Sequence, residues 1–168
     1  EHAGIPIILY NVPSRTGVNI SPEVYRQLCE NPLIRAAKEA SGSIAGIART
    51  KSLCGDELDI YAGNDDYIVP VMSLGGKGVI SVLGNLLPEA VCKMCSLCAK
   101  GDFSSAAKLQ IKLMPLIDAL FCDVNPIPIK EALSLSGFDA GPLRLPLYPL
   151  SEEKHEKLCS VLKDFDIV

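Results

Sequence analysis

Residues 33–53 have the sequence LIRAAKEASGSIAGIARTKSL, which contains one predicted β-strand and the helix that follows it. The strand covers Leu33 to Lys38, and the helix covers Ser43 to Leu53. The next predicted strand, Leu58 to Ala62, follows that helix after a short loop. A strand, a helix and a second strand in this order predict a parallel βαβ unit, because parallel neighbours need a crossover connection.

The same alternation extends through the first hundred residues. Ser21-Pro22-Glu23 supplies an N-cap, a proline at the first helical position and an early acid, and so opens a helix to about Glu30. Further strands are predicted at Ile5 to Tyr10 and Gly78 to Val82, and further helices at Asp65 to Leu74 and Pro88 to Lys100. The near-continuous apolar strands indicate burial on both faces. The sequence therefore predicts an α/β fold with four βα units in residues 1–100.

Four units leave a parallel sheet incomplete. An eight-stranded barrel commonly needs about 250 residues, and an open four-stranded sheet has two unpaired edges and an uncovered apolar face. A doubly wound sheet could use four strands, but it normally carries a glycine-rich phosphate loop after its first strand. Tyr10-Asn11-Val12-Pro13-Ser14 is not such a loop. Something beyond these four units must cover the sheet.

Residues 101–168 are predicted to form a separate helical region. Asp102 caps a long helix to Phe121, which Pro115 should kink or split. The proline-rich hinge 125–128 leads into a helix that ends near Gly137, and Ser151 caps a final helix after the loop 141–146.

Composition favours a soluble protein that acts on small molecules. The chain of 168 residues is 48% hydrophobic and has a formal net charge of −4, with a sequence pI near 5.2. Its basic residues are scattered, so no binding surface for nucleic acid or an anionic membrane is predicted. No apolar run approaches the roughly 18 residues of a membrane span. Glu1-His2-Ala3-Gly4 lacks the basic and apolar regions of a signal peptide, so we expect a cytoplasmic protein.

The seven cysteines are predicted to be reduced thiols, because their number is odd and no secretory signal is found. Cys92, Cys95 and Cys98 form a C-x2-C-x2-C run that raises an iron–sulfur or zinc site as an alternative. Asp102 stands where a ferredoxin would place its fourth cysteine, and the run falls on a predicted helix beside Val91. Core packing is therefore the favoured interpretation.

Lys38 is the first candidate for chemistry. Ile34 and Ala36 share its face of the strand, so its amine points into an apolar space where the charged form is disfavoured. A neutral amine is the form that attacks a ketone, so Lys38 is a candidate for Schiff-base formation. The alternative is a lysine that reaches solvent from the strand end and pairs with Glu39, and position alone favours that alternative.

Tyr10 and Arg15 are ambiguous in the same way. A tyrosine at a strand end is more often a core residue with a hydrogen-bonded hydroxyl than a proton relay. Arg15, in a loop bounded by proline and glycine, could bind a carboxylate through two parallel hydrogen bonds, or it could simply be solvated.

Four motifs taken together resolve these alternatives. The loop YNVPSRTG at 10–17, KEASG at 38–42, GGKGVISV at 75–82 and NPIPIK at 125–130 occur in that order. They resemble the dihydrodipicolinate synthase and N-acetylneuraminate lyase superfamily of class I pyruvate-dependent aldolases, over nearly the whole chain. The resemblance implies the C-terminal half of a TIM (β/α)8 barrel, with family strands five to eight in residues 1–100 and helices in 101–168.

The resemblance also assigns roles to individual residues. It makes Lys38 the lysine that forms an imine with pyruvate and Tyr10 the phenol that relays protons. It places Arg15 at the mouth of the site, near the carboxylate of an aldehyde substrate, and Gly63 and Ile80 at backbone positions that line the pyruvate pocket. It implies no metal or organic cofactor, so Asp65 and Asp66 are interpreted as acids at a helix start.

The implied reaction is the condensation of pyruvate with aspartate semialdehyde in the diaminopimelate route to lysine, and Arg15 favours it. N-acetylneuraminate lyase or keto-deoxy-sugar-acid aldolase activity is the alternative within the superfamily. Strands one to four of the family, with a threonine pair, a glycine-rich carboxylate motif and a partner subunit's tyrosine, do not occur in this sequence.

Two hypotheses of different class follow from that difference. The chain is either part of a lyase that is catalytic only with an N-terminal half, or a non-catalytic half-barrel that self-associates. We expect association under both, either as a homo-oligomer or with the N-terminal half.

Overall fold

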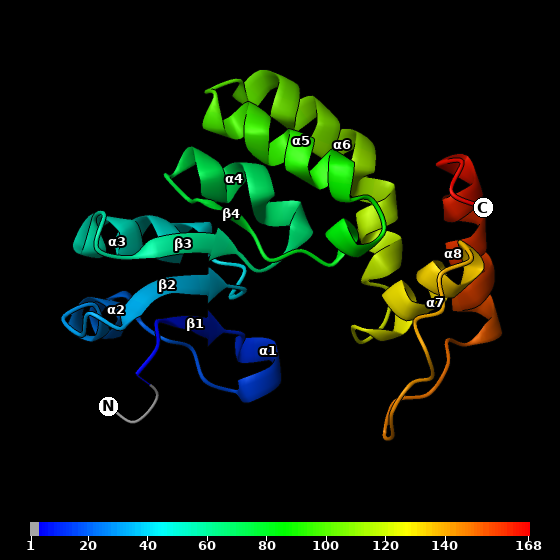
Figure 1. Cartoon of the computed structure of the whole chain (residues 1–168), viewed down its shortest axis with the longest axis horizontal. Coiled ribbons are helices and arrows are strands. Elements are labelled where there is room, and N and C mark those ends of the chain that lie inside the picture. Colours follow the sequence, from blue (N-terminus) through cyan, green and yellow to red (C-terminus); the bar gives the residue numbers. More distant parts are fainter. Residues whose placement is uncertain (1–3) are drawn as a thin grey trace.

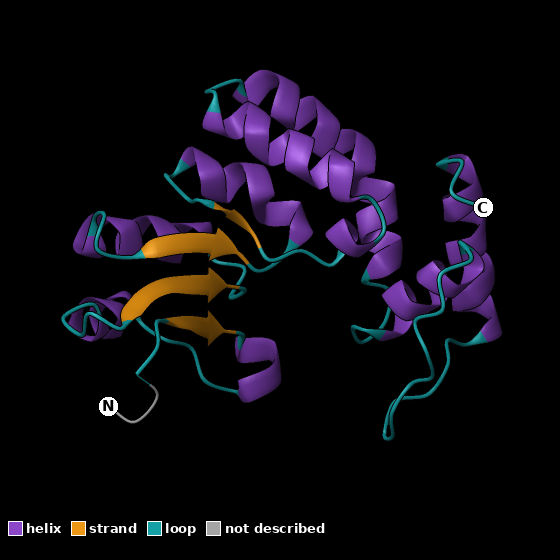
Figure 2. Cartoon of the chain, in the orientation of Figure 1, coloured by secondary structure: helices purple, strands orange, loops and turns teal. Residues whose placement is uncertain are grey.

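The computed structural model describes residues 4–168, and the expectation about Glu1 to Ala3 lies outside them. The first part of this region is a four-stranded parallel sheet with strand order β1-β2-β3-β4 (Figures 1 and 2). The strands are β1 (Ile7–Asn11), β2 (Ile34–Glu39), β3 (Asp59–Ala62) and β4 (Gly78–Val79). Each strand is followed by a helix, so the predicted α/β class and the four βα units are confirmed.

The helices that follow the strands include all those predicted, together with two short ones that were not. They are α1 (Pro13–Thr16), α2 (Pro22–Leu28), α3 (Ile44–Cys54), η1 (Asp65–Tyr67), α4 (Ile68–Ser73), η2 (Leu83–Asn85) and α5 (Pro88–Ala99). Ser21 caps α2 by accepting a hydrogen bond from the Val24 amide, and Ser43 caps α3 by accepting one from the Gly46 amide. The short α1 and η2 were not predicted.

The remaining helices are α6 (Phe103–Leu120), α7 (Ile127–Leu135) and α8 (Glu152–Asp164). Figure 1 shows that the arrowheads of β1 to β3 point toward the side of the molecule that holds α7 and α8. Of the two outcomes predicted for Pro115, a kink or a split, the split does not occur, because α6 runs through Pro115. Buried residues on both sides of Pro115, including Leu113, Leu116 and Leu120, hold α6 against the core and outweigh the missing hydrogen bond.

Strand register separates the side chains of the sheet into two faces. Tyr10, Lys38 and Tyr61 are paired across β1 to β3, and their neighbours Asn11, Glu39 and Ala62 form the next row. Successive residues point to opposite faces, so these two rows lie on opposite sides of the sheet. Leu9, Ala37 and Ile60 share the face of the second row, where they pack in clusters with residues of α2, α3 and α4.

The opposite face of β1 is open in this chain. Ile8 is 52% exposed and Tyr10 is 47% exposed. The largest core cluster lies elsewhere: it joins α4, α5 and α6 to α7 and α8 and so contains residues from both sides of position 100. The division into units 1–100 and 101–168 stays a prediction.

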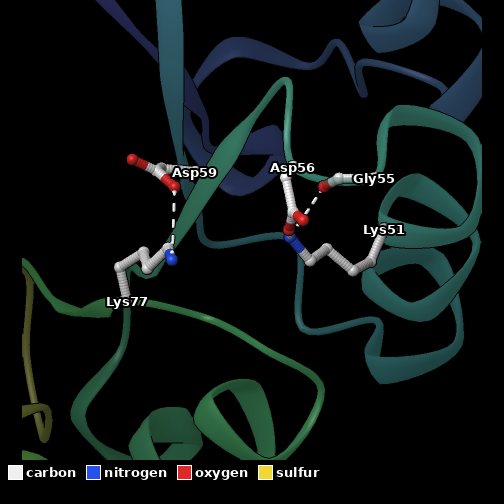
Figure 3. A network of polar contacts seen from close by, with 5 residues as sticks. All are labelled: Lys51, Gly55, Asp56, Asp59 and Lys77. Atoms are coloured by element: carbon white, nitrogen blue, oxygen red, sulfur yellow. Dashed lines mark hydrogen bonds and ion pairs between the residues drawn. The ribbon is translucent and has the colours of Figure 1, made fainter. Parts of the chain in front are cut away.

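Polar contacts tie the loops together at the amino end of β3, away from the strand ends that carry Lys38 and Tyr10 (Figure 3). Lys51 Nζ donates to the carbonyl oxygen of Gly55 at 2.7 Å and lies 3.2 Å from Asp56 Oδ1. Lys77, just before β4, lies 3.9 Å from Asp59 Oδ1 at the start of β3. These contacts fix the turn after α3 and the entry to β4.

No helix between residues 4 and 168 is both long and apolar enough for a transmembrane span.

Candidate active site

The carboxyl ends of β1 and β2 bring Tyr10 and Lys38 into contact. The two residues are register partners, and Lys38 Nζ lies 4.2 Å from the centroid of the Tyr10 ring. This distance is within the range of a cation–π interaction. Lys38 is half-buried, and no ion pair joins it to Glu39 anywhere in residues 4–168. The alternative of a lysine paired with Glu39 is therefore wrong.

A cavity of about 380 Å³ opens at this edge of the sheet. Its walls come from the ends of β1, β2 and β3, from α1 and from the loop between α6 and α7: Tyr10, Val12, Ser14, Arg15, Lys38, Ala40, Gly63, Asn64, Val82, Phe121, Asp123, Val124 and Asn125. Four of the five site residues assigned by resemblance line this cavity. The fifth, Ile80, does not line it, although its amide donates to the Ala62 carbonyl oxygen at 2.9 Å.

At the rim of the cavity, Arg15 connects α1 to the loop between α6 and α7. Its Nη2 donates to the carbonyl oxygen of Asn125 at 3.0 Å, while the side chain stays on the exposed surface. A guanidinium has five N–H donors, so this bond leaves others available for a carboxylate. Arg15 is exposed, as the solvated alternative requires, but its guanidinium also bonds the loop after α6.

Glu39 anchors the strand ends from the opposite face of the sheet. It is 7% exposed, and its carboxylate accepts hydrogen bonds from Asn11 Nδ2 at 3.0 Å, from the Tyr25 hydroxyl at 3.0 Å and from the Ser41 amide at 2.9 Å. Asn11 Oδ1 accepts from the Ile20 amide at 3.1 Å. Burial, and then the charge of Glu39, raises the pKa of the Tyr25 hydroxyl well above its usual range. This network fixes the backbone next to both Tyr10 and Lys38.

Gly63 lets two strand ends approach each other closely. Its amide donates to the Glu39 carbonyl oxygen at 2.8 Å. A Cβ atom at this position would lie 2.7 Å from Ala40 Cβ and 2.9 Å from that carbonyl oxygen. Only glycine fits here, so the backbone itself forms this part of the cavity wall.

Asp65 shapes the loop after β4. Its fully buried carboxylate accepts from the Val82 and Leu83 amides, both at 2.9 Å, and from the Ser81 hydroxyl. The predicted strand Gly78 to Val82 therefore ends early, because its last amides bond to Asp65 instead of a strand neighbour. Asp65 lies in the first turn of η1, as predicted, but its carboxylate also holds Val82 at the cavity wall.

The loop between α6 and α7 supplies wall residues that the sequence did not reveal. Phe121, Asp123 and Asn125 lie more than eighty positions after Lys38 and belong to no strand end. Lys154 Nζ of α8 donates to Asp123 Oδ2 at 2.6 Å. This hydrogen bond is the largest cause that lowers the pKa of Asp123 below its usual value. Only the NPIPIK motif pointed to this region.

The three cysteines of the C-x2-C-x2-C run do not share one environment. Cys98 is buried, Cys95 is half-buried and Cys92 is exposed, so the prediction of core packing fails for Cys92. Each step of three residues turns a helix by about 300°, which carries the first thiol of the run away from the core. In the described part of the chain, no cluster of three or more His, Cys, Asp or Glu residues is arranged to hold a metal ion.

The parallel sheet, its helices and the lysine at a strand end define a half barrel of the α/β class, followed by helices. The family model described as the dihydrodipicolinate synthetase family matches residues 1–165, and the chain belongs to this family.

Individual relatives agree with this assignment. The chain is 53% identical over 167 residues to 4-hydroxy-tetrahydrodipicolinate synthase of Caldicellulosiruptor saccharolyticus, covering 99% of this chain and 56% of the relative. It is 40% identical to the solved dihydrodipicolinate synthase of Thermotoga maritima, with a TM-score of 0.93 over 97% of this chain and 57% of that one. It is 38% identical to the enzyme of Acinetobacter baumannii solved in complex with pyruvate, with a TM-score of 0.93 over 98% and 57%. The chain thus spans little more than half the length of these relatives.

Proposed function

We propose that this chain carries the imine-forming half of a pyruvate lyase that condenses pyruvate with aspartate semialdehyde. The observation that carries the proposal is the contact of Lys38 Nζ with the Tyr10 ring in a cavity at the strand ends. Active sites of βα barrels lie at this end of the strands. A relative solved in complex with pyruvate supports the choice of the first substrate.

The residues present match the steps of such a reaction. The neutral amine of Lys38 attacks the ketone carbon of pyruvate, and loss of water gives the imine. Loss of a methyl proton then gives an enamine, whose carbon attacks the aldehyde. The Tyr10 phenol, beside the amine, relays protons during these steps. Arg15, at the rim, binds the carboxylate of the aldehyde substrate. The scheme needs no metal or organic cofactor.

We further propose that this chain alone stops at the imine. It spans 56% of the length of its relative, and the open face of β1 places Tyr10 next to an uncovered surface. Association with an N-terminal half, or with further copies of the chain, would exclude water from the cavity. We place the reaction in the cytoplasm, where seven unpaired cysteines remain reduced.

N-acetylneuraminate lyase or keto-deoxy-sugar-acid aldolase activity is the second candidate within the superfamily, and Arg15 at the rim argues against it. A non-catalytic half-barrel that self-associates is the candidate of another class. The exposed Ile7 and Ile8 on β1 favour it.

Reduction with borohydride in the presence of pyruvate tests the imine step. A reduced adduct blocks tryptic cleavage at Lys38, so residues 36–49 should appear as one modified peptide in the mass spectrum. Lys51 and Lys77, in the same sample, should stay unmodified. Lys38→Arg should give no adduct, and Tyr10→Phe should slow adduct formation by about 10²-fold or more. The matched control, Tyr148→Phe, should not slow it, because Tyr148 is 71% exposed and lies outside the cavity.

Turnover separates the lyase from the alternatives. The proposal is supported by two results together. The chain alone forms the adduct on Lys38 but does not consume aspartate semialdehyde, and the same chain consumes it once an N-terminal half is added. A folded chain with no adduct on Lys38 would show that this chain does not carry out the first chemical step.

A further inference from the structure

A cluster of three functional groups lies on the C-terminal helices, outside the cavity around Lys38. His155 and Cys159 are four residues apart on α8, so they share one side of the helix. His155 Nε2 lies 3.4 Å from Cys159 Sγ, and His155 Nδ1 lies 2.8 Å from Glu131 Oε1 of α7. Figure 1 shows α8 beside α7, the arrangement that brings the three groups together.

The order of the three groups fixes their protonation roles. A carboxylate accepts hydrogen bonds, so Glu131 takes the N–H at Nδ1 of the neutral ring. Nε2 is then the unprotonated nitrogen, and it faces the thiol as a hydrogen-bond acceptor. Transfer of the thiol proton to Nε2 gives a thiolate beside an imidazolium ion, whose charge the Glu131 carboxylate stabilises.

The cluster is accessible to small molecules. Cys159 is half-buried, and the side chains of His155 and Glu131 are 41% and 32% exposed. The neighbouring buried residues of α8, Leu158 and Leu162, fill the core and leave this flank of the helix open. Other charged groups stay near: Lys154 is held by Asp123, and Glu156 and Lys163 lie one turn from Cys159 on the same helix.

In the described part of the chain, the other six cysteines have no hydrogen bond to a histidine. Burial raises the pKa of the Cys95, Cys98 and Cys122 thiols, and it raises that of Cys54 to about 11. Interaction with the neighbouring Cys29 thiol also raises the pKa of Cys54. Cys92 is exposed, and no histidine contacts it within residues 4–168.

We propose that Cys159, His155 and Glu131 form a nucleophilic thiol site that is modified by small, soft electrophiles. In the modification, the sulfur of Cys159 forms a bond to an electrophilic carbon as the bond from that carbon to its leaving group breaks. The thiol proton passes to His155 Nε2 and from there to water. The site does not depend on the reaction proposed for Lys38.

Competitive alkylation of the whole chain with limiting iodoacetamide tests this site. Trypsin releases Cys159 in residues 158–163 and Cys92 in residues 78–93, each as the only cysteine of its peptide. At pH 7, Cys159 should react about 10-fold faster than the exposed Cys92, because His155 Nε2, 3.4 Å from its sulfur, accepts the thiol proton during the attack.

Two variants decide whether the imidazole is responsible. His155→Asn keeps an amide near Glu131 but removes Nε2, and it should reduce the rate at Cys159 to that of Cys92. Glu156→Gln changes a neighbouring exposed charge and should leave the rate within about twofold. The buried Cys54 should stay unmodified in all three proteins, which verifies that each is folded. Equal rates at Cys159 and Cys92 in the original chain, or an unchanged rate in folded His155→Asn, would overturn the proposal.

Discussion

Lys38 and Glu39 are neighbours in the chain but serve opposite faces of the sheet. Lys38 turns toward Tyr10 and the cavity, whereas Glu39 turns toward α2, where its carboxylate is buried. A buried charge is costly unless several donors satisfy it, and Asn11, Tyr25 and the Ser41 amide do so here. A polar network therefore fixes the strand end on the face opposite Lys38, and no carboxylate within residues 4–168 forms an ion pair with the Lys38 amine.

Tyr25→Phe tests how strongly this network stabilises the chain. The substitution removes one donor from a buried carboxylate and should lower the free energy of unfolding by about 1.5–3 kcal/mol. Urea denaturation followed by circular dichroism measures the change. Tyr148→Phe is the matched control, because Tyr148 is 71% exposed, and it should change the value by less than about 0.5 kcal/mol. Equal effects of the two substitutions would contradict a stabilising role for the Tyr25 hydroxyl.

An ion pair connects helix α8 to the wall of the candidate active site. Lys154 Nζ lies 2.6 Å from Asp123 Oδ2, and Asp123 lines the cavity. The pair lowers the pKa of Asp123 from its usual 3.8 and raises that of Lys154 from its usual 10.5. The ion pair therefore makes its full contribution to the free energy of unfolding between about pH 3.8 and pH 10.5. It is lost as the pH falls through the lowered pKa of Asp123 or rises through the raised pKa of Lys154.

Lys154→Met should return the pKa of Asp123 toward its usual value, because the largest cause of the shift is removed. A titration of the side-chain carboxyl carbon by NMR measures this pKa directly. Lys163→Met, on an exposed position near the end of the same helix, is the control and should leave Asp123 unchanged. If the pKa of Asp123 stays low in Lys154→Met, the pair does not connect α8 to the cavity as we describe.

Most helices could be predicted because their first residues carry the signal. Ser21, Ser43, Asp102 and Ser151 all act as side-chain caps at the expected positions. The errors at β4 and at Pro115 arise from contacts with residues that are distant in the sequence. The end of β4 was misplaced because Asp65, thirteen residues before Gly78, takes the amides that a strand would use. Pro115 did not end α6 because its neighbours are buried in the core.

The residues of the candidate site could be predicted from the sequence only in part, because the site is assembled from distant parts of the chain. Tyr10 and Lys38 lie near the carboxyl ends of β1 and β2, and Gly63 directly follows β3. The carboxyl ends of parallel strands meet at one edge of a sheet. Asp123 and Phe121 reach the same cavity from a loop between helices, a placement that depends on how α6 packs against α4 and α5. No local pattern encodes that packing. The Cys159–His155–Glu131 cluster depends in the same way on the packing of α7 against α8.

The uncovered face of β1 determines how the isolated chain behaves in solution. Ile8 is 52% exposed beside an unpaired strand edge, and such a surface favours pairing with a second copy. We expect a dimer or larger species in sedimentation velocity at micromolar concentrations. Ile8→Lys should give a monomer, because association would bury an unpaired charge. Ile111→Lys is the matched control: Ile111 is 70% exposed on α6 and not on the strand, and its substitution should leave association unchanged. A chain that is monomeric without any substitution, or an Ile8→Lys variant that still associates, would show that this face does not drive assembly.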